Sequence, residues 1–95
     1  MIERHVTFDV YPNLTQQFEE FFAAEYKPAM SQSAGFCSVE LLVNIDDPTK
    51  YHMVIVFDTL EDSDKWRASN AHAALAPKLK TMYTSSQVLI YRVAA

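Results

Sequence analysis

Glycine, cysteine and long hydrophobic runs are scarce in this sequence. Gly35 is the only glycine among 95 residues, whereas glycine-rich phosphate-binding loops need several glycines so that the backbone can approach phosphate. Cys37 is the only cysteine, which excludes an intramolecular disulfide and a cysteine-based zinc site. There is neither a run of about 18 apolar residues, as a membrane span requires, nor an apolar signal region after Met1. We therefore expect a cytoplasmic protein.

Positively charged residues are also few. Eight Lys and Arg residues stand against twelve Asp and Glu residues, which gives a net charge of −4. This balance argues against nucleic acid and against an anionic membrane surface as partners. Hydrophobic residues make up 49% of the chain and aromatic residues 13%, enough to bury one core. The length then predicts a single domain over residues 1–95.

Four segments have the composition of β-strands. Residues 2–10 alternate between apolar and polar side chains, as half-buried strands do. Residues 86–93 also have the period of a strand, with Val88 and Ile90 on one face and Leu89, Tyr91 and Val93 on the other. Residues 36–45 and 51–58 are separated only by a short turn rich in Asp and Pro, which predicts an antiparallel hairpin. The segment 51–58 is apolar on both faces at its centre, so we expect it to be a central strand.

Two helical regions separate these strands. Apolar residues recur at three- and four-residue steps over 13–26, which indicates an amphipathic helix with Asn13 as its N-cap. Pro28 should kink or interrupt that helix, and Gly35 should end the helical region. Thr59, followed three residues later by an acidic residue, predicts a second helix start.

The second helical region is expected in two pieces. The first carries Trp66 and ends near Ser69 and Asn70, which we expect to cap the pair of helices. The second covers about 71–83, with Pro77 in its first turns or bending it.

The order β-α-β-β-α-β predicts a ferredoxin-like α+β fold. Its four-stranded antiparallel sheet would carry both helical regions on one face. The strands are apolar on both faces, so the uncovered face needs a partner. Two copies packed sheet to sheet would supply it, so we expect a homodimer.

The stretch from Tyr51 to Leu75 resembles the signature of the antibiotic biosynthesis monooxygenase domain. Its elements here are Phe57, the acidic helix start at 59–62, Trp66, Ser69 and His72. The last strand, 88–93, is similar to that of the family as well. Two positions depart from the family pattern, because Phe57 is often Trp there and Ser63 stands where an apolar residue is common.

This resemblance implies a dimeric α+β barrel and an enzyme. Members of the family insert oxygen into small electron-rich aromatic molecules such as phenols, anthrones or quinols, with molecular oxygen as co-substrate and no metal or flavin cofactor. On this basis Trp66 and His72 are the candidate catalytic residues.

Two alternatives rest on other resemblances. The opening segment 2–8 is similar to the first strand of stress-responsive A/B barrel proteins, which would make the chain a non-catalytic binding module for a small apolar ligand. Haem-degrading relatives carry Asn on the first strand and His seven residues after the serine. Residues 1–10 contain no Asn and the second position is Ala76, so the haem-binding alternative is less favoured.

Each candidate residue also has a purely structural interpretation. Trp66 could stack on a planar substrate and donate a hydrogen bond, or it could simply fill the core. His72 could act as a general base, or it could bond to backbone at a helix junction. The candidate substrate-binding residues could form an adaptable apolar wall of a cavity, or they could simply belong to the core. They are Phe22, Tyr26, Met30, Met53 and Met82.

The remaining histidines and the cysteine have weaker signals. His5 and His52 lie on predicted strands, and no two histidines have the local spacing of metal ligands, so no metal site is expected. One of the two strand histidines could line the pocket. Cys37 is expected to be a small buried hydrophobic residue.

Overall fold

Four antiparallel strands form one sheet in the computed structural model, which describes residues 1–95. They are β1 (Ile2–Val10), β2 (Phe36–Val43), β3 (Lys50–Phe57) and β4 (Tyr83–Arg92), in the spatial order β2-β3-β1-β4. The central position of β3 and its antiparallel pairing with β2 confirm the hairpin prediction. β2 ends two residues earlier than expected, and β4 begins three residues earlier.

The first helical region is not one regular helix. It consists of a 3-10 turn η1 (Pro12–Leu14), α1 (Thr15–Phe21), a π-helical turn η2 (Phe22–Tyr26) and α2 (Lys27–Ser31). The prediction of Asn13 as N-cap is wrong. Asn13 lies inside the 3-10 turn, and Leu14 occupies the N-cap position with no side-chain hydrogen bond.

Pro28 explains the wide turn. Proline has no N–H, and its ring crowds the carbonyl four residues earlier. Here Pro28 lies in the first turn of α2, where proline is tolerated. The preceding Lys27 N–H reaches back five residues to the Phe22 carbonyl. The expected interruption is therefore a π-helical turn, and the chain remains helical from α1 through α2.

The two helices of the second helical region begin at the predicted caps, but the second ends at Lys80, three residues earlier than expected. Helices α3 (Leu60–Ala68) and α4 (Asn70–Lys80) meet at Ser69. The Thr59 side chain accepts a hydrogen bond from the Asp62 N–H (3.1 Å), and the Ser69 hydroxyl accepts one from the His72 N–H (3.1 Å). Pro77 lies inside α4. None of the helices combines the length and the apolar character needed to cross a bilayer.

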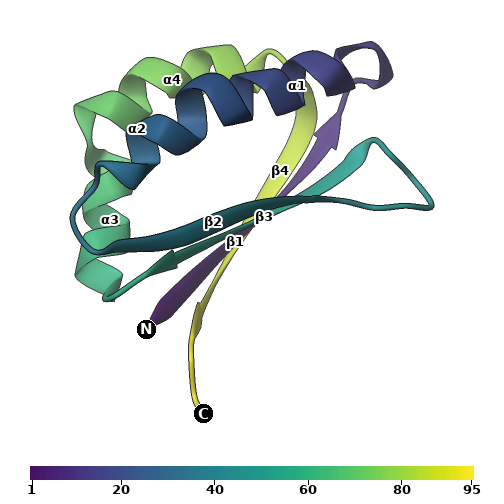
Figure 1. Cartoon of the computed structure of the whole chain (residues 1–95). Helices are drawn as coiled ribbons and strands as arrows, with labels where there is room; N and C mark the ends of the chain where they lie inside the picture. Colours follow the sequence, from purple (N-terminus) through teal and green to yellow (C-terminus); the bar gives the residue numbers. More distant parts are fainter.

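The helices cover only one face of the sheet (Figure 1). Val6 pairs with Met53 on one side and Val88 on the other, which places these side chains on the helix-covered face. The core between the layers includes the fully or almost fully buried side chains Phe18, Met30, Met53, Ile55 and Phe57. The opposite face has no helix, and Leu89 and Tyr91, which are each 49% exposed, belong to it by register. This α+β arrangement is the predicted ferredoxin-like fold.

Two expectations near the start of β2 need correction. Cys37 is exposed rather than buried, because the register between β2 and β3 shifts between Phe36 and Ser38 and leaves Cys37 unpaired in the bulge. Its thiol donates a hydrogen bond to Asp58 Oδ1 (3.2 Å). Gly35 does not cap the helix, which ends at Ser31, but has a φ of 75° in the following turn.

Candidate active site

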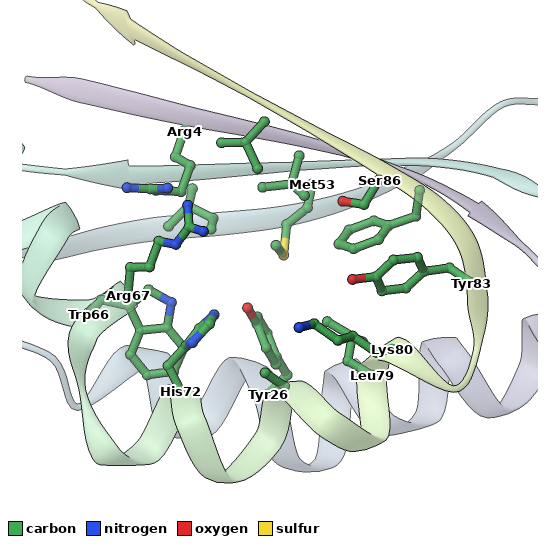
Figure 2. A pocket seen from close by; sticks show the side chains of 15 residues that line it. Arg4, Tyr26, Met53, Trp66, Arg67, His72, Leu79, Lys80, Tyr83 and Ser86 are labelled. Atoms are coloured by element: carbon green, nitrogen blue, oxygen red, sulfur yellow. The ribbon is translucent and has the colours of Figure 1, made fainter.

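A cavity of about 210 Å³ lies between the sheet and the helical layer. Figure 2 shows the sheet on one side of it and the helices on the other, with side chains from both pointing inward. Val6, Phe8, Met53 and Ile55 supply apolar surface from the two central strands. The cavity thus has an apolar floor from the sheet and polar groups placed mainly by the helices.

Three ring side chains form one wall of the cavity. The Tyr26 and Trp66 rings lie edge to face with centroids 5.8 Å apart, and Trp66 and His72 do the same at 5.5 Å. Trp66 is 2% exposed and Tyr26 4%, so both are packed in the core while also lining the cavity. The structural and functional interpretations of Trp66 therefore do not exclude each other.

The junction at Ser69 brings Trp66 and His72 together. The Ser69 hydroxyl donates to the Trp66 carbonyl (2.6 Å) and accepts from the His72 N–H (3.1 Å). Only the backbone of His72 is used in this junction, and its imidazole makes no hydrogen bond within the chain. That ring is free to exchange a proton with a molecule in the cavity.

Tyr26 is a hydrogen-bond donor in this environment. Burial raises the pKa of Tyr26 to about 12, an effect only partly opposed by Trp66 and by the nearby cations Arg4 and Arg67. The phenol therefore stays protonated at neutral pH. Tyr26 is the last residue of the π turn, so the irregular helix is what presents this hydroxyl to the cavity (Figure 2).

The charged side chains around the cavity are all positive. Arg4, Arg67 and Lys80 line it, and no Asp or Glu does. Burial, followed by the charges of these three residues, lowers the pKa of His72 below its ordinary value. His72 is therefore neutral at pH 7 and able to accept a proton.

Arg4 is held by a polar neighbour on α3. It is 5% exposed on the apolar face of β1, and its Nε donates to Ser63 Oγ (3.1 Å). A guanidinium nitrogen also lies 3.5 Å from Asp64 Oδ1. Ser63 is completely buried, and its hydrogen bond with Arg4 accounts for a polar side chain at a position where the sequence resemblance led us to expect an apolar one.

The sequence-predicted residues fall into two groups. The structure places Trp66, His72, Tyr26 and Met53 around the cavity. Three others do not line it: Phe22, Met30 and Met82. Met30 is completely buried in the core, whereas Phe22 and Met82 border other surface hollows.

Sequence reasoning missed the cationic members Arg67 and Lys80 and the aromatic Tyr83. Arg4 left a visible signal, because it is the one charged residue on the apolar face of the first strand. Nothing in the sequence distinguished Arg67 and Lys80, since charged residues on a helix normally face solvent. Ala76 also lines the cavity, so the position where haem-degrading relatives carry histidine provides no ligand here.

The other two histidines lie elsewhere. His5 Nδ1 is 2.8 Å from His52 Nε2, and His5 Nε2 is 2.9 Å from Glu3 Oε1. By register these side chains belong to the open face of the sheet, away from His72. No group of three His, Cys, Asp or Glu residues in the structure is arranged to hold a metal ion.

Comparisons with known proteins agree with this architecture. A family model described as "Antibiotic biosynthesis monooxygenase" matches residues 1–78. SnoaB, a cofactor-independent oxygenase from Streptomyces nogalater, superposes with a TM-score of 0.89 at 19% identity, over 99% of this chain and 93% of that one. No curated protein matches the sequence.

Two further solved structures are similar. A protein from Bordetella bronchiseptica assigned by name to the same family has a TM-score of 0.88 at 20% identity, covering 99% of this chain and 97% of its own. Another from Nitrosomonas europaea has a TM-score of 0.87 at 17% identity, with complete coverage of both chains. At these identities the likeness establishes the fold.

Proposed function

Because the chain belongs to the antibiotic biosynthesis monooxygenase family, we propose that it is a cofactor-independent monooxygenase acting on a small phenol or quinol in the cavity beside Trp66 and His72. One observation carries the proposal. The imidazole of His72 is neutral, makes no hydrogen bond within the chain and lines a cavity whose charged residues are all positive. The naming of SnoaB as a cofactor-independent oxygenase supports the same reaction type.

The chemistry needs a substrate that is itself the reductant. His72 would take the proton from a ring hydroxyl, and the resulting anion is electron-rich enough to pass one electron to O₂. Recombination of the two radicals forms a carbon–oxygen bond and a hydroperoxide. Loss of water from that hydroperoxide leaves a carbonyl. In total the substrate loses two hydrogens and gains one oxygen atom, and the second oxygen leaves as water, so no external reductant is consumed.

The residues of the cavity fit these steps. Arg4, Arg67 and Lys80 would stabilise the substrate anion, and a fixed arrangement of charges and donors around a developing anion is usually a large catalytic term. The Tyr26 hydroxyl would donate to a ring oxygen. Trp66 and Met53 would hold the ring and exclude water, which strengthens each of these interactions.

The volume of the cavity restricts the substrate. A cavity of about 150 Å³ accommodates benzene, and the present one measures about 210 Å³. Pockets for larger, drug-sized ligands start at about 300 Å³. A phenol or quinol with one ring and its substituents fits this space better than a three-ring anthrone.

The proposal includes a homodimer formed through the helix-free face of the sheet. That face carries exposed apolar side chains, among them Leu42, Leu89 and Tyr91, and pairing with a second copy would remove them from water. Light scattering on the purified chain tests this part. A charged substitution on this face, Leu89→Glu on β4, should favour the monomer.

Oxygen uptake by the metal-free protein tests the activity. We expect uptake with phenols or quinols, a loss of about 10²-fold or more in His72→Ala, and a smaller loss in Trp66→Phe, which keeps the aromatic wall. Lys27→Met is the control, since Lys27 is exposed and outside the cavity. Quenching of Trp66 fluorescence by the same compounds without any uptake would contradict the proposal and indicate a binding module.

A further inference from the structure

The charge of the cavity is opposite to that of the chain. Acidic residues outnumber Lys and Arg by twelve to eight, yet all three charged residues that line the cavity are Arg or Lys. The phenolate formed in the reaction is stabilised by all three charges, but the buried Arg4 already supplies one beside the ring, and two further cations at the opening exceed what a single phenolate needs. The imbalance indicates that the ligand brings a negative charge of its own.

Two of these cations have no partner in the protein. Four of the eight Lys and Arg side chains form ion pairs, namely Arg4, Lys50, Lys65 and Lys78. Neither Arg67 nor Lys80 forms an ion pair or a side-chain hydrogen bond. Both are exposed and line the cavity, so they lie where it meets solvent.

Arg67, Lys80 and Arg4 surround the same cavity and all affect the charge state of His72. Figure 2 shows Arg67 entering from α3 on the side of Trp66, and Lys80 from α4 on the side of Tyr83, with His72 and Tyr26 between them. Both charges, together with that of Arg4, contribute to lowering the pKa of His72. A bound anion would offset this repulsion, whereas a cationic ligand would add to it.

The roles of the cations differ. Arg4 is buried and already engaged by Ser63 and Asp64, so it contributes a fixed positive charge beneath the ligand. The side chains of Arg67 and Lys80 are free to form new hydrogen bonds. A guanidinium and an ammonium are the groups that proteins use to bind carboxylates.

We propose that the substrate is a phenol or quinol bearing a carboxylate, that Arg67 binds this carboxylate at the opening of the cavity, and that Lys80 adds positive charge from the opposite side. This deepens the proposed function and rests on it for the reaction, although the binding itself is tested without turnover. The carboxylate fixes the orientation of the ring, so that a ring hydroxyl lies toward His72 and Tyr26.

Matched ligands separate a carboxylate from a phenolate as the recognised anion. Dihydroxybenzoate and its methyl ester have the same ring hydroxyls, but the ester replaces the charged carboxylate by a neutral group that is larger by one methyl. Calorimetry without oxygen, supported by quenching of the single tryptophan, should show the acid binding at least about tenfold more tightly at low salt. The preference should shrink as ionic strength rises.

The variants locate the contact. Arg67→Met with Lys80→Met should bring the two affinities within about twofold of each other, while Lys27→Met, which removes an unpaired lysine outside the cavity, should keep the preference. Equal affinity for acid and ester in the native protein, or a preference that survives in the double variant, would overturn the proposal. Circular dichroism checks that the double variant is folded.

Binding and oxidation can fail separately. If the acid binds preferentially but no compound supports oxygen uptake, the carboxylate site stands and the oxygenase proposal falls. If hydroquinone is oxidised while the acid has no advantage in binding, the oxygenase proposal stands and the carboxylate site falls.

Discussion

Arg4 and Ser63, which are 59 residues apart in the sequence, form a buried hydrogen bond of 3.1 Å between β1 and α3. Each is an exception to its local pattern, since Arg4 is the charged residue on an apolar strand face and Ser63 a polar residue in the buried stripe of a helix. Together they place the positive charge of Arg4 beside the cavity, and Ser63 accepts the hydrogen bond of the Arg4 Nε–H, so that no water is needed there.

Removing the serine should therefore destabilise the protein. Ser63→Ala leaves a buried guanidinium N–H without its acceptor, and we expect a loss of about 1–3 kcal/mol in the free energy of unfolding, measured by urea denaturation. Arg4→Met combined with Ser63→Ala should cost less than the sum of the single changes, because both polar groups are then absent. Additive losses would show that the two residues do not depend on each other.

The Ser69 cap should matter for activity as well as for stability. Ser69→Ala is expected to cost about 1 kcal/mol and also to lower kcat, because the hydroxyl joins the Trp66 carbonyl to the His72 N–H. Thr59→Ala is the matched control, since it removes the equivalent cap of α3 without touching either residue. A comparable fall in kcat in both variants would indicate a general effect of helix fraying.

The pH dependence of kcat/KM should report His72. Burial and the charges of Arg67, Arg4 and Lys80 lower the pKa of His72, so the active neutral form persists below the ordinary histidine value of about 6.5. The acid limb of the profile should lie below that pH. Arg67→Met removes one repelling cation, which raises the pKa of His72 and moves the limb to higher pH. A limb that does not move would contradict this assignment of the base.

Tyr26 should act through its hydroxyl alone. Tyr26→Phe keeps the ring that packs against Trp66, so we expect a folded protein with kcat lowered by about 10²-fold. Because burial raises the pKa of Tyr26 to about 12, its ionisation plays no part near neutral pH, and the acid limb should be the same in the variant. An unchanged kcat would remove Tyr26 from the catalytic account.

Much of the fold followed from periodicity, and the errors have local causes. The alternation in β1 identified the strand because one of its faces, with Val6, Phe8 and Val10, is buried under the helices, whereas β4 is exposed along nearly its whole length. The apolar spacing in 13–26 survives the π turn, so it gave no sign that the helix widens over Phe22–Tyr26. The bulge that exposes Cys37 depends on pairing with β3, which the sequence of β2 alone does not encode.

The site was only partly visible in the sequence. His72 follows Trp66 by six positions, and on one continuous helix this spacing would turn them well away from each other. They meet because Ser69, with a ψ of 156°, breaks the helix between them. The family resemblance selected both residues, but the contribution of Arg67 and Lys80 required knowing how α3 and α4 face the sheet.

Isotope labelling tests the central claim most directly. Chelator-treated protein is given a phenol or quinol substrate under ¹⁸O₂, and product and water are analysed by mass spectrometry beside His72→Ala. We predict one labelled oxygen atom in each product molecule and the other in water, with no dependence on added metal or flavin and a large loss of rate in the variant. Product without label, or turnover that needs an added metal or flavin, would contradict a cofactor-independent monooxygenase.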